Sequence, residues 1–286
     1  MKSSVLILLG AILWGIIGIF VRTLTPLGFS AVELVTLRSY ITAIGLVLIL
    51  LITNPQKLII KLSHLWYFVG TGLLSFVFFN TCYFKAMEYA SLSVAAILLY
   101  TAPFFVMGMS AVFLKEKITR QKIVALLVAF LGCILVSGVA DGGASLSARG
   151  FLWGLGAGFG YALYSIFATF ALKKYDTLTV ITYTFLVAAV SATFLCNPIH
   201  MAQTLSQSPQ SLWILILYGI LTGAAAYYFY TKGLEKTPPA KASVIATAEP
   251  VVATICGAMC FGEIPSVFGI AGIFLVIFAV LYLQKQ

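Results

Sequence analysis

The residue best suited to take part in chemistry is Glu249, which is the one charged side chain in the apolar stretch VIATAEPVVATICG (244–257). If that stretch crosses a membrane, a carboxylate near its middle costs about 2.5–3.5 kcal/mol even on lenient scales, so it must face a cavity or a partner. Pro250 follows directly and has no N–H, so the carbonyl of Ala246 loses its helical donor and the helix should kink. Two interpretations stay open: Glu249 exchanges a proton or holds an amine, or it is a structural carboxylate bonded to a neighbouring helix.

A second charge, Arg38, lies inside another apolar stretch, where it must pair or reach toward the membrane surface. Glu33 precedes it by five residues and is therefore not on the same helix face. A structural pairing is the favoured interpretation for Arg38. A pair with Glu249 is the other option, although the spacing offers no support for it.

The sequence predicts no metal site. Cys256 and Cys260 share a helix face at i and i+4, but no histidine or carboxylate spacing completes a ligand set. All five cysteines lie in or at the end of apolar stretches, where small apolar fillers are expected rather than a disulfide framework. No cofactor is expected either.

The medium around these residues follows from the composition. The chain is 62% hydrophobic and 9% charged, whereas a soluble domain carries about 25% charged residues. A membrane-spanning helix needs about 20 mostly apolar residues, and long apolar runs without the alternation of barrel strands predict helices. Ten such stretches are present, at 4–22, 31–53, 65–84, 91–114, 121–139, 149–172, 178–197, 212–231, 240–261 and 266–283.

The ninth stretch gives the expected depth of Glu249. Thr237 and Pro238 have the residue types of a helix N-cap and a first helical residue. Glu249 then lies about eleven residues into the helix, roughly 16 Å, which is near the middle of the ~30 Å hydrocarbon core.

The net charge of +9 does not indicate nucleic acid, because the basic residues sort by side. If ten spans alternate, Lys85 and Arg149 fall on one side, with Arg22 near it. The other side receives Lys2, Lys57, Lys61, Lys115, Lys117, Arg120, Lys122, Lys173, Lys174, Lys232, Lys236, Lys241 and Lys285. This bias predicts a multi-pass protein of the cytoplasmic membrane with both termini in the cytoplasm.

The sequence also aligns with itself, without gaps, at an offset of 147 residues. The strongest block pairs YFKAMEYASLSVAAILLYTAPFFV, from Tyr83, with YTKGLEKTPPAKASVIATAEPVV, from Tyr230. The predicted halves are 3–139 and 150–286, joined by a Gly- and Ser-rich linker at 138–150. Each half holds five spans, an odd number, so the halves should enter the membrane in opposite senses around a pseudo-two-fold axis, with a binding site near the midplane between them.

That symmetry predicts a central cavity. Glu249 aligns with Ala102, so one half alone supplies the charge, whereas Pro250 aligns with Pro103, so both halves supply a kink that we assign to the fold and its gating. Aromatic faces attract organic cations, although any single Tyr or Trp can instead be a packing or interface residue. The candidate lining residues, of which Trp14, Asn80, Tyr100, Tyr161 and Tyr227 should share one continuous space, are Trp14, Asn80, Tyr83, Tyr100, Tyr161, Tyr164, Tyr227, Tyr230, Thr247 and Glu249.

A family resemblance emerges from these motifs. LLGAILWGIIGIF at the start, LVTLRSYITA in the second span and YTAPFFV…FLKEKIT in the fourth and fifth resemble an EamA-type member of the drug/metabolite transporter superfamily. ATAEPVVATICGAMCFGEI in the second half resembles the same motif again. The resemblance covers essentially the whole chain. It implies an all-α membrane protein of ten transmembrane helices, arranged as two inverted five-helix EamA repeats around a central cavity.

The resemblance also implies a function. We expect a secondary transporter, not an enzyme, that exports small metabolites such as amino acids or amines across the cytoplasmic membrane by alternating access. The expected partners are a small-molecule substrate, a proton as candidate coupling ion and the lipid bilayer; the sequence does not define the oligomeric state. A nucleotide-sugar exchanger of the same superfamily is the nearest alternative. An integral-membrane enzyme or a channel is less supported, because His64 and His200 lie in short connections and one carboxylate does not line a pore.

Overall fold

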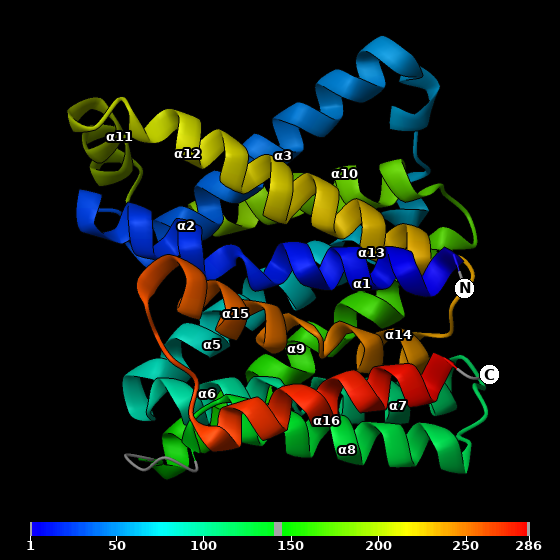
Figure 1. Ribbon diagram of the computed structural model, residues 1–286. Coiled ribbons are helices and arrows are strands. Elements are labelled where there is room, and N and C mark those ends of the chain that lie inside the picture. Colours follow the sequence, from blue (N-terminus) through cyan, green and yellow to red (C-terminus); the bar gives the residue numbers. More distant parts are fainter. Residues whose placement is uncertain (1, 140–144, 285–286) are drawn as a thin grey trace.

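The computed structural model describes residues 2–139 and 145–284, and it is a bundle of ten membrane-spanning helices (Figure 1). Eight helices, or nine if a bent pair counts as one span, are long and apolar enough to cross a membrane by length and composition alone. A further helix of 17 residues, Arg120–Val136, reaches the lower limit of about 17 residues for a span. The predicted all-α membrane fold is therefore confirmed.

Each half contains five spans, which differ in how their helices are divided. The first half comprises α1 (Lys2–Gly15), α2 (Ile17–Leu24), η1 (Thr25–Leu27), α3 (Ala31–Thr53), η2 (Pro55–Leu58), η3 (Leu62–His64), α4 (Leu65–Val69), η4 (Gly70–Val77), α5 (Phe78–Tyr89), α6 (Leu92–Leu99), α7 (Ala102–Phe113) and α8 (Arg120–Val136). The second comprises α9 (Ala148–Leu172), α10 (Thr177–Thr193), α11 (Pro198–Gln207), α12 (Ser211–Tyr218), η6 (Gly219–Ala225), α13 (Ala226–Leu234), α14 (Pro239–Ala246), α15 (Glu249–Phe261) and α16 (Val267–Gln284).

The irregular parts of the spans repeat with the 147-residue offset of the sequence. The fourth span breaks between α6 and α7, and the ninth breaks between α14 and α15 at the equivalent residues. The third and eighth spans each contain a π-helical stretch, η4 and η6, at overlapping positions of the repeat. Local distortions at matched positions show that the two halves share one backbone plan.

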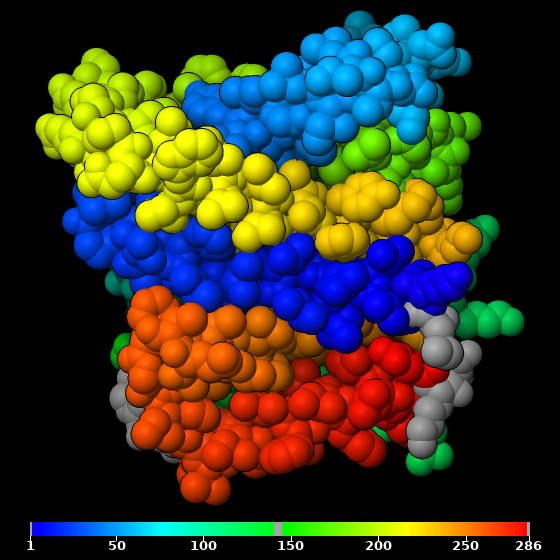
Figure 2. Space-filling view, turned by 45° about the horizontal axis from the view of Figure 1, so that its top comes forward, coloured from blue at the N-terminus to red at the C-terminus, as the bar shows by residue number. Residues whose placement is uncertain are grey.

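The halves interlock rather than lie side by side. The first span of each half packs on the third span of the other: α1 against α13, and α9 against α5. The same first spans also contact the broken helices of the other half, α1 with α14 and α15, and α9 with α6 and α7. Figure 2 shows α1 lying between α12–α13 and α14–α15 on one face. This reciprocal packing is what an inverted repeat requires.

The remaining spans pair with their own counterparts at the two sides of the bundle. The second spans α3 and α10 pack together, and the fifth spans α8 and α16 do the same. Neither α8 nor α16 contributes a residue to the central cavities described below, in agreement with their almost wholly apolar sequences.

The two ends of the bundle differ in charge. Both termini lie at one end in Figure 1. Connections rich in lysine gather there: Lys57 Nζ pairs with Asp176 at 3.0 Å, and Lys122 Nζ pairs with Glu116 at 2.8 Å. Gln121 also donates to the backbone of Tyr282 near the C-terminus. The connections that contain Lys57 and Lys122 thus lie at the same end as the termini, as the sequence predicts.

Helix starts follow from local polar residues. Ser30 caps α3 in a capping box, since its hydroxyl accepts from the N–H of Glu33 and the Glu33 carboxylate accepts from the N–H of Ser30. The same type of side-chain cap begins α6, α8, α9 and α10, supplied by Ser91, Thr119, Ser147 and Asp176.

Three sequence expectations need correction or restriction. The helix start in the ninth span lies one residue beyond the predicted cap, because Pro238, not Thr237, is the N-cap and Pro239 is the first helical residue of α14. The seventh span ends at Thr193, earlier than the predicted residue 197. The chain then turns by 101° into the short helix α11, which lies in the connection between the predicted seventh and eighth spans. Residues 140–144 of the predicted linker 138–150 lie outside the described residues.

Candidate functional site

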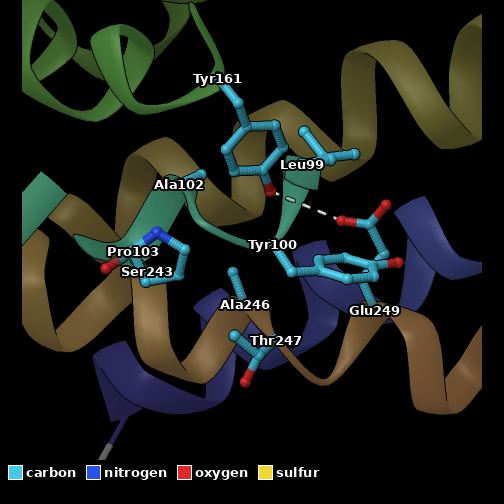
Figure 3. A pocket seen from close by; sticks show the side chains of 9 residues that line it. All are labelled: Leu99, Tyr100, Ala102, Pro103, Tyr161, Ser243, Ala246, Thr247 and Glu249. Atoms are coloured by element: carbon cyan, nitrogen blue, oxygen red, sulfur yellow. Dashed lines mark hydrogen bonds between the residues drawn. The ribbon is translucent and has the colours of Figure 1, made fainter. Parts of the chain in front are cut away.

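The two broken helices meet at the centre of the bundle and enclose a small cavity (Figure 3). Its volume is about 20 Å³, which is enough for one water molecule and far below the roughly 300 Å³ of a small-molecule pocket. The lining residues come from both breaks and from α9: Leu99, Tyr100, Ala102, Pro103, Tyr161, Ser243, Ala246, Thr247 and Glu249.

Glu249 is the first residue of α15 and lies ten residues beyond the start of α14, or about 15 Å along the helix. Its side chain is partly buried beside the cavity. The Tyr161 hydroxyl donates to its Oε2 at 3.5 Å, a long hydrogen bond, and Figure 3 shows that hydroxyl aimed at the carboxylate. No described lysine, arginine or histidine lies within 4.0 Å of Glu249. Among the described residues, the Glu249 carboxylate therefore has the Tyr161 hydroxyl as its side-chain hydrogen-bond partner and no ion-pair partner.

Pro250 breaks the ninth span, but the bend falls earlier than the sequence indicates. Thr247 and Ala248 form the break, whereas Glu249 itself is already helical. Proline supplies no N–H to Ala246, which lines the cavity. Pro103 does the same to Leu99 on the opposite wall. In each half, one residue that lines this cavity therefore has a backbone carbonyl without its usual helical hydrogen-bond donor.

A second cavity of about 10 Å³ adjoins the first through Tyr161, which lines both. Its walls are mostly aromatic: Trp14, Ser75, Phe79, Tyr161, Tyr164, Ser165, Tyr227 and Tyr230. Trp14 is at the middle of this cluster. Its ring centroid is 5.1 Å from that of Tyr227, 5.0 Å from Tyr230 and 6.0 Å from its own repeat counterpart Tyr161.

Several hydroxyl groups around this second cavity form hydrogen bonds with other side chains of the protein. Tyr164 shares a hydrogen bond of 2.6 Å with Thr231, and Tyr230 shares one of 2.7 Å with Ser165. These pairs join α9 to α13 within the second half. They fix the aromatic cluster, which leaves the Tyr161 hydroxyl as the one that reaches toward the charged residue.

The structure brings together most of the predicted lining residues, but not in one space. Trp14, Tyr164, Tyr227 and Tyr230 line the second cavity, Tyr100, Thr247 and Glu249 line the first, and Tyr161 lines both. The expected single continuous cavity is divided in this conformation.

Two predicted residues line neither of these cavities. The Asn80 side-chain amide is buried and donates to the carbonyl of Phe76 in its own helix at 2.7 Å. The Tyr83 ring stacks on Phe79, with 6.1 Å between the centroids. Tyr83 thus contacts a residue that lines the second cavity, Phe79, whereas the hydrogen-bond partner of Asn80, Phe76, lines neither cavity.

Arg38 is buried, as the sequence expected, but its pairing is not ionic. No described carboxylate lies within 4.0 Å of its guanidinium. The guanidinium carbon is instead 5.0 Å from the ring centre of Phe76 and 5.3 Å from that of Tyr218. The alternative pair with Glu249 is likewise absent within that distance.

Several residues that line a cavity or contact a predicted site residue were not predicted from the sequence. Ser165 follows Tyr161 by four residues, so helical periodicity alone could have placed it on the same face. Phe76 and Tyr218, which flank Arg38, carry no such signal. His200 is also not a free connection residue: its Nδ1 lies 2.7 Å from the buried Glu33 carboxylate and ties α11 to α3.

The described residues contain no group of three or more His, Cys, Asp or Glu side chains that could hold a metal ion. Polar and aromatic residues around a partly buried carboxylate have the chemistry to bind an organic cation or to exchange a proton. Together with the fold, this site defines a multi-pass membrane protein of the inverted-repeat transporter class.

The chain belongs to the EamA-like transporter family, which it matches over residues 1–138 and again over 148–284. Its curated relatives include the uncharacterized transporter YwfM of Bacillus subtilis (strain 168), 24% identical over 98% of this chain and 93% of the relative. An uncharacterized transporter of Archaeoglobus fulgidus is 25% identical over the full length of both chains. A solved crystal structure superposes with a TM-score of 0.78 at 16% identity, covering 99% of this chain and 96% of the other, which supports the fold alone.

Proposed function

We propose that this protein is a secondary transporter that exports small metabolites, in the class of amino acids, amines and related compounds, across the cytoplasmic membrane. Its family and curated relatives are transporters, which implies a small-molecule substrate and a membrane environment. Transport rather than catalysis is the activity we assign, with Glu249 and the aromatic residues around it as the binding site.

The observation that carries this proposal is the position of Glu249. It is a mid-span carboxylate at a helix break, it faces a cavity between the two repeats, and its hydrogen bond to Tyr161 is long. Holding such a charge in a membrane is costly. A group that alternately binds a proton and a substrate ammonium gives a reason to keep it, because the two cations then compete for one site and their movements are coupled.

The closed centre supports an alternating-access cycle. Cavities of about 20 and 10 Å³ cannot admit a metabolite, so the helices around them must separate for substrate to enter. The breaks at Pro103 and Pro250 lie at equivalent places in the two repeats and are the natural hinges. Movement at one break would open the site to one side, and movement at the other break would open it to the opposite side.

The orientation we propose puts the end with both termini in the cytoplasm, because the lysine-rich connections lie there. A nucleotide-sugar exchanger fits less well, since neither cavity wall contains a lysine or arginine for phosphate groups. A channel would need a continuous polar path, and the division of the centre into two small cavities does not supply one.

Reconstituted protein in liposomes with an imposed pH gradient tests the role of Glu249. We expect a screen of labelled amines, amino acids and nucleotide sugars to show gradient-driven movement of an amine or amino acid. Glu249→Gln keeps size and hydrogen bonding but removes titration. If Glu249 exchanges protons, this variant loses pH-driven accumulation and keeps substrate exchange; if it binds an amine, both fall.

The matched control is Glu88→Gln, at an exposed carboxylate that pairs with Lys85. It should transport as the unmodified protein does. Normal gradient-driven transport by the Glu249→Gln variant, per folded molecule, would remove Glu249 from the mechanism and leave it a structural role.

A further inference from the structure

Two equivalent glutamates, Glu116 and Glu263, lie in the last connection of each half, at opposite ends of the bundle (Figure 1). The turns that present them have the same backbone geometry. The preceding residues, Lys115 and Gly262, both adopt the left-handed conformation, with φ of 55° and 70°. In both turns the N–H of the glutamate donates to the carbonyl oxygen six residues earlier, at 3.1 and 3.2 Å. The repeat therefore holds two carboxylates in the same way, one at each end.

The Glu116 carboxylate joins the two halves at the end that holds the termini. It contacts Lys122 Nζ at 2.8 Å and accepts a hydrogen bond from the N–H of Ala240 at 3.2 Å. Ala240 is the second residue of α14, whose N-cap is Pro238 and which has no side-chain cap of its own. The first N–H groups of a helix need an acceptor and favour a negative charge. Glu116 thus supplies, from the first half, the acceptor that α14 lacks.

Glu263 does not make the equivalent contact at the other end. It pairs instead with Arg22 of α2, and both side chains are about half exposed, at 53% and 47%. The residue that aligns with Ala240 is Ser93, the second residue of α6. The N–H of Ser93 forms no hydrogen bond with another described residue. An exposed ion pair contributes little stability, so Glu263 is held weakly, away from the helix start that matches the one bound by Glu116.

The broken spans are packed differently at the two ends. At the end with the termini, α14 packs against α7, and Met107 and Val244 share a buried cluster with residues of α8 and α16. The equivalent helices at the other end, α6 and α15, form no comparable contact within the part of the chain that the structure describes. The two ends therefore differ in state: the broken spans are closed together where the glutamate bonds the opposite half, and they are apart where it does not.

We propose that Glu116 and Glu263 form alternating gating contacts of the transport cycle. Glu116 closes the cytoplasmic end by bonding the start of α14, as in this structure. When the cytoplasmic end opens and the external end closes, Glu116 releases Ala240, and Glu263 leaves Arg22 to accept from the N–H of Ser93. This inference rests on the proposed function, from which it takes alternating access and the orientation, but it does not depend on the identity of the substrate.

Two matched cysteine reporters measure which end is open in the purified protein. The five natural cysteines are first replaced by alanine. Met107→Cys then lies in the buried cluster at the cytoplasmic end, and Thr254→Cys occupies the equivalent position in α15. Because the Met107 side chain is buried, Met107→Cys should react slowly with a water-soluble maleimide until the cytoplasmic end opens.

Loss of the Glu116 contact should open the cytoplasmic end. We expect Glu116→Ala to raise the rate of Met107→Cys labelling about 10-fold or more, because a hydrogen bond to a charged acceptor is lost from one state only. The rate at Thr254→Cys should not rise, because the external end closes in the same step. Glu116→Gln keeps the size and loses the charge, so it should give a smaller rise in the same direction. It carries the test if the alanine variant does not fold.

Changes at the external end, made in the Glu116→Ala background, should have effects of opposite sign. Adding Glu263→Ala removes the acceptor for the N–H of Ser93, so Met107→Cys labelling should fall again by about 10-fold. Adding Arg22→Gln instead releases Glu263 from its exposed ion pair, so labelling should rise further, by about 2- to 5-fold. A simple ion-pair brace would give the two variants the same effect.

The outcomes separate this inference from the proposed function. If Glu116→Ala leaves Met107→Cys labelling unchanged, or raises the labelling of both reporters together, the gating contact at the cytoplasmic end is refuted. Effects of the same sign for Arg22→Gln and Glu263→Ala would refute the external one. Glu88→Ala, at an exposed carboxylate paired with Lys85, is the matched control and should change neither reporter. If the labelling follows the prediction but no amine or amino acid is transported, the proposed substrate class fails and the gating contacts stand.

Discussion

A single methyl group added to a helix that packs against a helix break should disturb the packing at that break. The first such position is in α9. A methyl group on Gly158 of α9 would lie 2.6 Å from the Thr101 hydroxyl and 2.9 Å from the carbonyl oxygen of Leu98. The carbonyl belongs to the backbone, and the Thr101 hydroxyl is held by its own hydrogen bond to Leu98. Gly158→Ala must therefore push α9 away from the break between α6 and α7.

The first span of the other half, α1, supplies a second site for the same perturbation, at the break between α14 and α15. A methyl group on Gly15 of α1 would lie 2.6 Å from the Cβ of Val252 and 2.8 Å from the carbonyl oxygen of Glu249. Overpacking of this kind costs about 1–3 kcal/mol, whereas glycine to alanine in an open helix gains up to ~1 kcal/mol. We expect both variants to be less stable by about 1–2 kcal/mol, and to transport more slowly because the hinge surface is displaced.

Gly108 is the matched control, since it lies in α7 beside the same break and has no atom within 4 Å of an added methyl group. Gly108→Ala should be as stable as the unmodified protein or slightly more so. Unfolding in mixed detergent micelles measures stability, and counterflow in liposomes measures rate. If Gly15→Ala and Gly158→Ala match Gly108→Ala in both assays, the close packing at the breaks has no mechanical role.

Two further predictions concern charge and topology. Lys122→Met removes the cation that lies 2.8 Å from the mostly buried Glu116 carboxylate. The carboxylate keeps its hydrogen bond from the N–H of Ala240, so we expect a loss below the ~3–5 kcal/mol of a fully buried pair in the same unfolding assay. Lys85→Met in an exposed pair should have little effect, and equal losses would contradict the role of burial. In a variant without natural cysteines, Glu88→Cys should react with an impermeant maleimide on intact cells and Glu235→Cys only after permeabilisation; reaction of both from one side would disprove the inverted arrangement.

The carboxylate and the helix breaks could be predicted from the sequence because they depend on residues within one helix. The size of the cavity could not, because it depends on packing between helices. Pro103 and Pro250 act within their own helices, because a missing N–H disrupts the turn wherever the helix lies. The size of the space beside them depends on α9 and α1, which approach so closely that glycine is required at Gly158 and Gly15. Two small cavities that share Tyr161 take the place of the expected continuous one.

The sequence alone determined the medium, the ten spans and the two repeats of this protein. Apolar length sets which segments must be helical in lipid, since their backbone groups have no other partner there. The ungapped offset of 147 residues placed both breaks, and it aligned Glu249 with the uncharged Ala102. These features depend on neighbours along the chain, so they survive without knowledge of the fold.

Only the tertiary structure decided which side chains meet. The Asn80 side chain donates to the carbonyl of Phe76 in its own span, and Arg38 stacks between two rings that no sequence spacing relates to it. The rotation of each helix about its axis and its neighbours across the bundle fix such contacts. A difference of one or two residues around a helix turns a side chain from a cavity toward lipid, which is why the candidate site needed the packed bundle to be defined.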